Sequence, residues 1–281
     1  MNRFFLSLFS LALMTLSACA QNAAQRECVE GALFDQIVAH FFDPQTGRTT
    51  PYVAGTCEPK TIPAHPSQAE EALIINLEEV DCTTFVEYVT AARLAGLAEF
   101  DAQNVAFQKQ VEQLRYRHGI RGNYATRKHY FMEWIKEGEE LSLMTDVSGQ
   151  LSGAKLLTKR IDFMSAHPQF YPQLKDAVLL SAIKEVENRL SREKVYYIPT
   201  SQIPAAQGGM QHGDIVTFVT DQAGLDVQHV GFVYDPSHTG RPSLLHASSS
   251  QKQVTISSGT IADYARSVKH VMGIRVIRLN P

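Results

Sequence analysis

The sequence Val80-Asp81-Cys82-Thr83-Thr84-Phe85-Val86-Glu87-Tyr88-Val89 (residues 80–89) places a cysteine at the expected start of a helix. Asp81 is a suitable N-cap, and Phe85, Val86 and Val89 give the following turns an apolar face. A cysteine in the first turn lies at the positive end of the helix, where unpaired N–H groups favour the thiolate and can bind an oxyanion. This position suits a nucleophile, although a cysteine at a helix start is by itself more often a small core residue.

The last third of the chain carries histidines in short apolar runs. If residues 227–234 and 243–247 pair as a hairpin, His229 and His246 meet on one face of the sheet. A cysteine nucleophile needs a nearby base and a group that orients the base. We therefore expect His229 to act as the base for Cys82, with His246 bonded to its other ring nitrogen. A single histidine would be assigned to the surface or the core, but three matched residues predict nucleophilic catalysis.

The pattern of apolar residues predicts an α+β protein. Helical spacing is found in residues 27–42, roughly 67–140 and 171–194. Short β-rich runs typical of antiparallel strands follow, over residues 215–219, 227–234, 243–247, 254–257 and 272–279. We expect a single catalytic unit over residues 27–281, with a mainly helical part at 27–194 packed on a β-rich part at 195–281 that forms a sheet or small barrel.

Length and composition exclude several classes of protein. The chain has 281 residues, a formal charge of −3, 44% hydrophobic and 20% charged residues, which is typical of a globular protein with a sizeable core. This balance argues against a disordered chain and against a basic nucleic-acid binder. No apolar stretch after residue 20 reaches the roughly 20 residues that cross a bilayer, which excludes a polytopic membrane protein.

The N-terminus has the pattern of a signal peptide over residues 1–18, with Arg3 followed by an apolar run. Leu16-Ser17-Ala18-Cys19 resembles the lipobox of bacterial lipoproteins, in which the cysteine is lipidated. The alternative is an ordinary A-x-A cleavage site at residues 18–20. In both cases we expect an exported protein of the cell envelope or periplasm, anchored to a membrane if Cys19 is modified.

Three cysteines remain after Cys19: Cys28, Cys57 and Cys82. An odd number in an oxidising compartment leaves one free thiol. Cys28 and Cys57 flank a stretch rich in proline and threonine and are candidates for a disulfide. The alternative is three reduced, buried cysteines, and the sequence does not fix the pairing.

Four motifs in order, Asp-Cys-x-x-Phe-Val-x-Tyr, Gly-Asp-Ile-x-x-Phe, His-Val-Gly and Leu-His-Ala, resemble the NlpC/P60 papain-like cell-wall hydrolases. A narrower resemblance, to the DUF1460 family of N-acetylmuramoyl-L-alanine amidase-like proteins, covers nearly the whole mature chain. Its motifs are matched here by residues 52–56, 81–85, 115–119, 127–134, 224–226 and 246–249.

The resemblance implies a papain-like fold and a Cys-His-His triad of Cys82, His229 and His246. Tyr52 lies in a segment similar to the Tyr-x-x-Gly-Gly of these enzymes and is a candidate for binding the oxyanion, although Thr56 replaces the second glycine. The implied reaction is hydrolysis of the peptidoglycan amide between N-acetylmuramic acid and L-alanine, without metal or cofactor. A stem-peptide endopeptidase and a non-catalytic envelope-binding module are the alternatives, since fold is weaker evidence for substrate.

Residues 115–134 mix cations with aromatic rings, which suits a substrate that carries carboxylates and sugars. The candidate substrate contacts are Arg115, Arg117, Tyr130 and Trp134, together with Asp81 and Ser248. The alternative is that the basic residues lie on a solvated face and the aromatic residues in the core. Peptidoglycan or a soluble muropeptide is the expected partner, nucleic acid is not, and the oligomeric state is not predicted.

Overall fold

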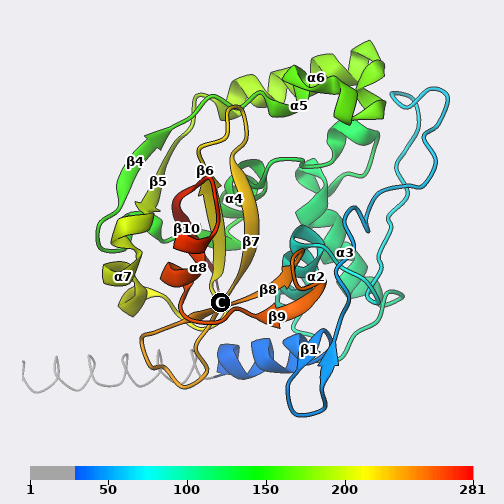
Figure 1. Cartoon of the computed structure of the whole chain (residues 1–281). Coiled ribbons are helices and arrows are strands. Elements are labelled where there is room, and N and C mark those ends of the chain that lie inside the picture. Colours follow the sequence, from blue (N-terminus) through cyan, green and yellow to red (C-terminus); the bar gives the residue numbers. More distant parts are fainter. Residues whose placement is uncertain (1–28, 281) are drawn as a thin grey trace, which may run out of the picture.

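The computed structural model describes residues 29–280 of the chain, which fold as an α+β protein (Figure 1). The expected α+β class is confirmed. The predicted signal peptide at residues 1–18, the lipidation site Cys19 and Cys28 lie outside the described residues.

Most helices lie on the two faces and at one end of a central sheet (Figure 1). The first described helix covers residues 29–38. Within residues 29–280, none of the helices combines the length and apolar character that crossing a membrane requires. The later helices are α2 (Cys82–Leu94), α3 (Val105–Arg115), α4 (Phe131–Glu140), α5 (Phe163–Ala166), α6 (Ala177–Leu190), α7 (Ile203–Ala206) and α8 (Ile261–Ser267).

The sheet has the strand order β4-β5-β10-β6-β7-β8-β9, and every neighbouring pair is antiparallel. β3 pairs with the C-terminal part of β10, beyond the residues that pair with β5. A separate pair, β1 (Phe42–Asp43) and β2 (Arg48–Thr49), forms a small ribbon. The strands of the sheet are β3 (Met144–Asp146), β4 (Lys155–Thr158), β5 (Lys194–Pro199), β6 (Ile215–Thr220), β7 (Val227–Tyr234), β8 (Ser243–Ser248), β9 (Gln253–Ile256) and β10 (Val271–Leu279).

Alternation along the strands gives the sheet two apolar faces, each covered by helices. On one face Phe85 of α2 packs against Phe232 of β7, with ring centroids 5.6 Å apart. On the other face Ile261 and Ala265 of α8 pack against Phe218 of β6 and neighbouring strands. Helix α2 lies over β7 and β8, and helix α8 lies over β8 and β10 on the other face.

Some strands of the sheet come from a region that the sequence pattern assigned to helices. The five predicted runs correspond to β6, β7, β8, β9 and β10, but β3 and β4 come from residues before 195, and β5 begins at Lys194. Strands of three or four residues are too short to show an alternating pattern. Residues 67–81 are also irregular rather than helical, because their backbone is bonded to distant segments, as in Glu71 N–H to Gly122 O at 2.7 Å.

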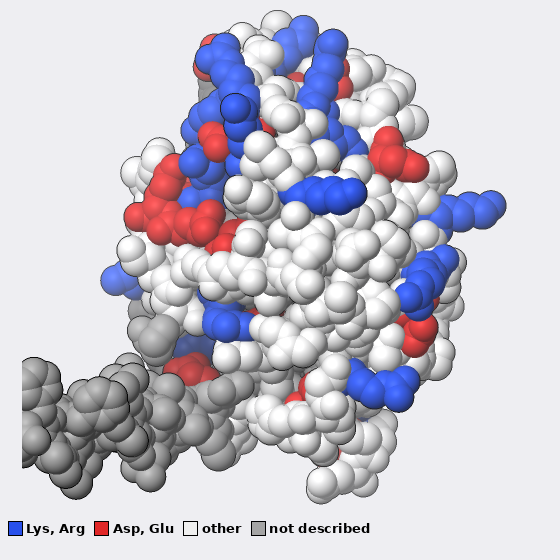
Figure 2. Space-filling view, turned by 90° about the vertical axis from the view of Figure 1, so that its left-hand side faces the viewer, with Lys and Arg blue, Asp and Glu red and all other residues white. Residues whose placement is uncertain are grey.

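Charges of both signs are distributed over the surface near β4, β5 and α7. Figure 2 shows this face with Lys and Arg gathered toward the end where α5 and α6 lie, Asp and Glu among and beside them, and a mainly uncharged centre. This distribution lacks the single-sign stripe that marks a nucleic-acid groove on the face shown.

The first prediction concerns Gly231 on β7, which leaves no room for a side chain beside β8. A Cβ at this position would lie 2.7 Å from the carbonyl oxygen of Leu245 and 3.0 Å from the Cβ of His246. We expect Gly231→Ala to lower the free energy of unfolding by about 1–3 kcal/mol, since the strands must separate. Urea unfolding measures the change.

The matched control is Gly208→Ala, where an added Cβ meets no atom within 4 Å. We expect a change of at most about 0.5 kcal/mol for this variant. Equal stabilities of the two variants would contradict the close approach of β7 to β8.

Candidate active site

Asp81 caps helix α2 and fixes Cys82 as its first residue. Its Oδ1 accepts a hydrogen bond from the backbone N–H of Thr84 at 2.8 Å, and the Thr84 hydroxyl oxygen accepts one from the Asp81 N–H at 2.9 Å. This is a capping box. Asp81 Oδ2 also accepts from the N–H of Gly55 at 3.1 Å, which ties the preceding loop to the helix start. The Asp81 carboxylate, a candidate substrate contact, is thus engaged in capping.

Cys82 is half-buried and free. Burial, followed by the charge of Asp81, raises the pKa of the Cys82 thiol to about 11, although contacts from Thr83 and the Val230 backbone act in the opposite direction. Burial thus acts against the thiolate that the sequence pattern favours at the helix start. The presence of a thiolate there stays a prediction.

His229 on β7 and His246 on β8 form a hydrogen-bonded pair. The His229 Nε2 and His246 Nδ1 atoms are 2.7 Å apart, and the ring planes are inclined at 84°. The strands are neighbours in the register Phe232 opposite Leu245. The expectation that a β7–β8 pairing brings both histidines to one face is confirmed.

Both histidines are uncharged at neutral pH. Burial, and secondarily the neighbouring His246, lowers the pKa of His229 to about 3, and burial lowers the pKa of His246 to about 4. His246 Nε2 is buried and has no hydrogen-bond partner within the described part of the chain. A neutral imidazole can accept a proton, but a pKa of about 3 makes His229 a weaker base than an exposed histidine.

Cys82 and His229 line the same cavity of about 150 Å³. Val230, next to His229 on β7, contacts the Cys82 sulfur through its backbone. One wall of the cavity is aromatic and the other is formed by the chain leading into β7. Further lining residues are Glu87, Lys128, His129, Tyr130, Phe131, Trp134, Leu225, Asp226, Val227 and Gln228.

The basic residues of segment 115–134 are held inside the protein by ion pairs. Arg115 is 3% exposed, and its Nε and Nη1 donate to Glu87 Oε2 at 2.9 Å and to Ile74 O at 2.6 Å. Arg117 Nε donates to Glu133 Oε1 at 2.5 Å. The two alternatives for these cations were contact with the substrate and a solvated face. Neither describes Arg115 and Arg117, because both guanidinium groups are bonded to other residues of the protein.

The remaining substrate candidates lie in two places. Tyr130 and Trp134 line the cavity; the Tyr130 hydroxyl donates to Glu187 Oε1 at 2.7 Å, and Trp134 stacks on Phe131 at 4.8 Å between ring centroids. Ser248 is buried at the end of β8, where its Oγ is 3.1 Å from that of Ser250. Both aromatic side chains are buried in the hydrophobic core, at 2% and 5% exposed, as the alternative for the aromatic residues predicted, and they border the cavity from there.

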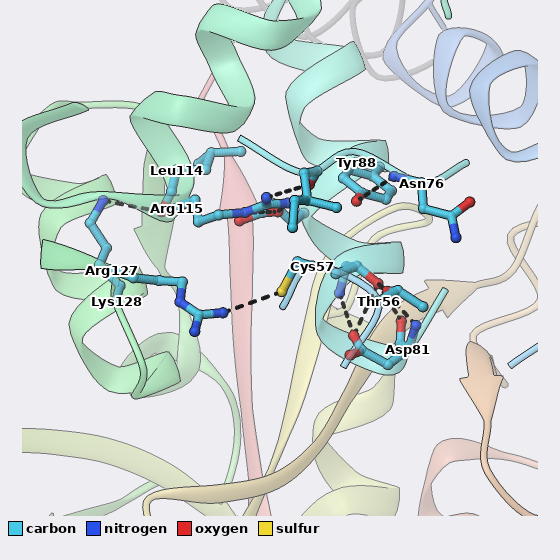
Figure 3. A network of polar contacts seen from close by, with 12 residues as sticks. Thr56, Cys57, Asn76, Asp81, Tyr88, Leu114, Arg115, Arg127 and Lys128 are labelled. Atoms are coloured by element: carbon cyan, nitrogen blue, oxygen red, sulfur yellow. Dashed lines mark hydrogen bonds and ion pairs between the residues drawn. The ribbon is translucent and has the colours of Figure 1, made fainter. Parts of the chain in front are cut away.

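Cys57 is half-buried beside a buried guanidinium and forms no disulfide within residues 29–280. Arg127 Nη1 donates to Cys57 Sγ at 3.6 Å, as drawn in Figure 3, and burial raises the pKa of the Cys57 thiol. Cys28, the other half of the candidate disulfide, lies outside the described residues.

Tyr52 and Tyr264 both lie near the Cys82 sulfur. Burial, and next a negative charge on Cys82, raises the pKa of each hydroxyl, that of Tyr264 to about 12. Tyr52 forms a parallel bridge with Val80 and was expected near the nucleophile. The sequence analysis missed Tyr264, although the capping box of Thr260 with Asp263 marks the start of its short helix.

Comparisons with known proteins identify the family of the chain. A family model described as AmiA-like, N-acetylmuramoyl-L-alanine amidase-like, matches residues 46–274. The chain belongs to this family. The earlier resemblance to amidase-like proteins is confirmed at this level. No curated protein matches the chain.

Solved structures resemble this amidase-like chain over most of its length. An N-acetylmuramoyl-L-alanine amidase from Bacteroides uniformis is 33% identical, with 89% of this chain and 99% of that chain covered and a TM-score of 0.76. A Bacteroides fragilis protein named as a candidate xylanase is 34% identical, with 82% and 96% covered and a TM-score of 0.70. A Legionella pneumophila protein of the DUF1460 family, 20% identical with 90% and 89% covered, shares the fold at a TM-score of 0.63.

The histidine pair predicts acid sensitivity of this amidase-like fold. Because the pKa values of His229 and His246 lie below that of an unfolded histidine, the unfolded state binds more protons as pH falls below about 6.5. We expect the free energy of unfolding to fall by about 2 kcal/mol for each histidine between pH 7 and pH 5. Urea unfolding across this range measures the loss.

His246→Gln should reduce the pH dependence, since one of the two titrating groups is removed. His238→Gln, on an exposed loop, is the control and should leave the pH dependence unchanged. A flat stability profile in the parent chain would contradict burial of the neutral pair.

Proposed function

We propose that this chain is a cysteine amidase of the NlpC/P60 papain-like type that hydrolyses the peptidoglycan amide bond between N-acetylmuramic acid and L-alanine. The observation that carries the proposal is the His229–His246 hydrogen bond of 2.7 Å in a site where His229 and Cys82 share one cavity. Membership of the amidase-like family and the similar B. uniformis amidase support this substrate.

His246 sets the tautomer of His229 in the proposed mechanism. With His229 Nε2–H donating to His246 Nδ1, the lone pair of His229 Nδ1 is free to take the thiol proton of Cys82. A base is required because the pKa of Cys82 is about 11. Proton transfer therefore accompanies attack rather than preceding it.

The first half of the reaction forms a thioester. The Cys82 sulfur bonds to the amide carbonyl carbon as its proton moves to His229, and the carbonyl oxygen becomes an oxyanion. The Cys82 backbone N–H and the Tyr52 hydroxyl are the proposed donors to this oxygen. His229 then returns the proton to the amide nitrogen, the C–N bond breaks, and the amine of the alanine end leaves.

The second half releases the acyl group. Water loses a proton to His229 as its oxygen attacks the thioester carbon, the C–S bond breaks, and the sulfur regains the proton. The products are one carboxyl group and one amine for each water consumed. His246 is not consumed in either half and keeps His229 oriented.

Glycoside hydrolysis, the activity implied by the name of the B. fragilis relative, requires two carboxyl groups across the scissile bond. The acidic residues that line the cavity are Glu87 and Asp226. Glu87 is paired with Arg115, and Asp226 Oδ2 accepts from the Met132 N–H at 2.7 Å. These engagements favour the amidase over a glycosidase.

The first test of the amidase proposal is mass spectrometry of the products released from purified peptidoglycan. We expect free stem peptides that begin with L-alanine, and their loss in Cys82→Ala by at least about 1000-fold because the nucleophile is gone. Cys57→Ala is the matched control, since Cys57 is also a half-buried cysteine but does not line the cavity. It should retain activity.

Two results would replace the proposal. Stems truncated within the peptide would identify an endopeptidase. No product dependent on Cys82, from either sacculi or soluble muropeptides, would identify a binding module or another amide substrate.

We also propose that the chain is exported and lipid-anchored, with residues 1–18 removed and Cys19 modified. The lipobox-like sequence Leu16-Ser17-Ala18-Cys19 supports this proposal. Metabolic labelling with a clickable fatty acid should mark the full chain and leave Cys19→Ser unlabelled. Cys28→Ser, nine residues downstream, is the control and should keep the label. An unlabelled but exported parent chain would favour cleavage without an anchor.

A further inference from the structure

An aromatic side chain outside the triad covers the histidine pair. Tyr264, on the seven-residue helix α8, has its ring centroid 5.0 Å from that of His246 and 5.8 Å from that of His229. The Tyr264 ring also meets Phe218 of β6 edge-on at 4.9 Å, and Phe218 lies 5.9 Å from His229. Two rings from separate elements thus pack on the hydrogen-bonded pair, in which His246 is buried and His229 is half-buried.

This pair contains a buried polar atom that lacks a partner. His246 is 2% exposed, and its Nε2 has no hydrogen-bond partner within residues 29–280. If His229 Nε2–H donates to His246 Nδ1, the neutral tautomer of His246 carries its hydrogen on Nε2. An unsatisfied donor of this kind binds water wherever water can reach it.

We propose that Tyr264 is a positioning residue of the site, whose ring closes the sheet face over His229 and His246 and excludes water from their hydrogen bond. This inference rests on the proposed function of the triad. Tyr264 acts through the histidines and is not assigned a contact with the substrate.

The dry environment, rather than a nearby charge, keeps the histidines neutral. Burial is the main cause of the lowered pKa of His229, and the neighbouring His246 is the second cause. Burial is also the cause of the lowered pKa of His246. The titratable groups around the pair are Cys82 at the start of α2 and Tyr264 itself. The cavity that His229 lines also holds Glu87, Lys128, His129, Tyr130 and Asp226. On α8, Arg266 and Asp263 pair with each other on the exposed side.

Replacement of the Tyr264 ring should therefore change the protonation of the pair. In Tyr264→Leu, water reaches His246 Nε2 and the charged imidazolium becomes better solvated. We expect the pKa of His229 and His246 to rise by about one pH unit or more toward the value of an exposed histidine. In Tyr264→Phe the ring remains, and both values should stay close to those of the parent chain.

The test is a histidine NMR titration of the full chain and its variants, which does not depend on any substrate. Tyr234→Leu is the matched control, because Tyr234 is also half-buried and also packs on a histidine, His212, at 5.3 Å, but away from the triad. Tyr264→Gln provides the same comparison should the leucine variant fail to fold.

A rise confined to Tyr264→Leu or Tyr264→Gln supports the proposal. An unchanged titration in those variants, or an equal rise in Tyr234→Leu or Tyr264→Phe, overturns it. The outcome is separable from the amidase proposal, because the histidines titrate whether or not peptidoglycan is cleaved.

The activity, where present, supplies a second readout. The acid limb of kcat/KM should move upward by about one pH unit in Tyr264→Leu, with near-parental rates above pH 8. A uniform loss of rate at every pH would indicate a purely structural role and would count against the proposal.

Discussion

The candidate site depends on the cap that Asp81 places on helix α2. One carboxylate bonds the Thr84 N–H at 2.8 Å with Oδ1 and the Gly55 N–H at 3.1 Å with Oδ2. The first bond determines where the helix begins, and hence where Cys82 lies relative to β7. The second holds the loop that carries Tyr52 over the same helix end. A single side chain therefore places both the candidate nucleophile and a candidate oxyanion donor.

Ion pairs between buried residues hold the segments that line the cavity. Figure 3 shows Arg115 and Arg127 reaching toward α2, where Arg115 pairs with Glu87 and Arg127 contacts Cys57. Burying such a pair costs free energy because both charges lose their hydration, and removing one partner leaves the other charge uncompensated. Their effect here is to fix the segments that carry the lining residues. Two charged residues that line the cavity, Glu87 and Lys128, are paired with Arg115 and Glu137, which limits the net charge beside Cys82 and the histidines.

The sequence predicts those parts of the site that depend on local pattern. Cys82 follows an N-cap, and His229 and His246 lie on runs whose alternation is readable, so their meeting could be expected. The ion pairs of Arg115 and Arg117 could not, because a sequence shows charge but not its distant partner. Tyr264 was missed since its helix is short and its contacts with β7 and β8 join residues far apart in the chain.

Strand β10 lies in the middle of the sheet although it follows all the other described strands in the sequence. It pairs with β6 along one edge and with β5 and β3 along the other. Until residues 271–279 have left the ribosome, β5 and β6 both lack the strand that lies between them. The sheet therefore cannot assemble strand by strand during translation. The architecture thus delays assembly of the sheet until β10 has been synthesised, and a product terminated before β10 would retain open strand edges.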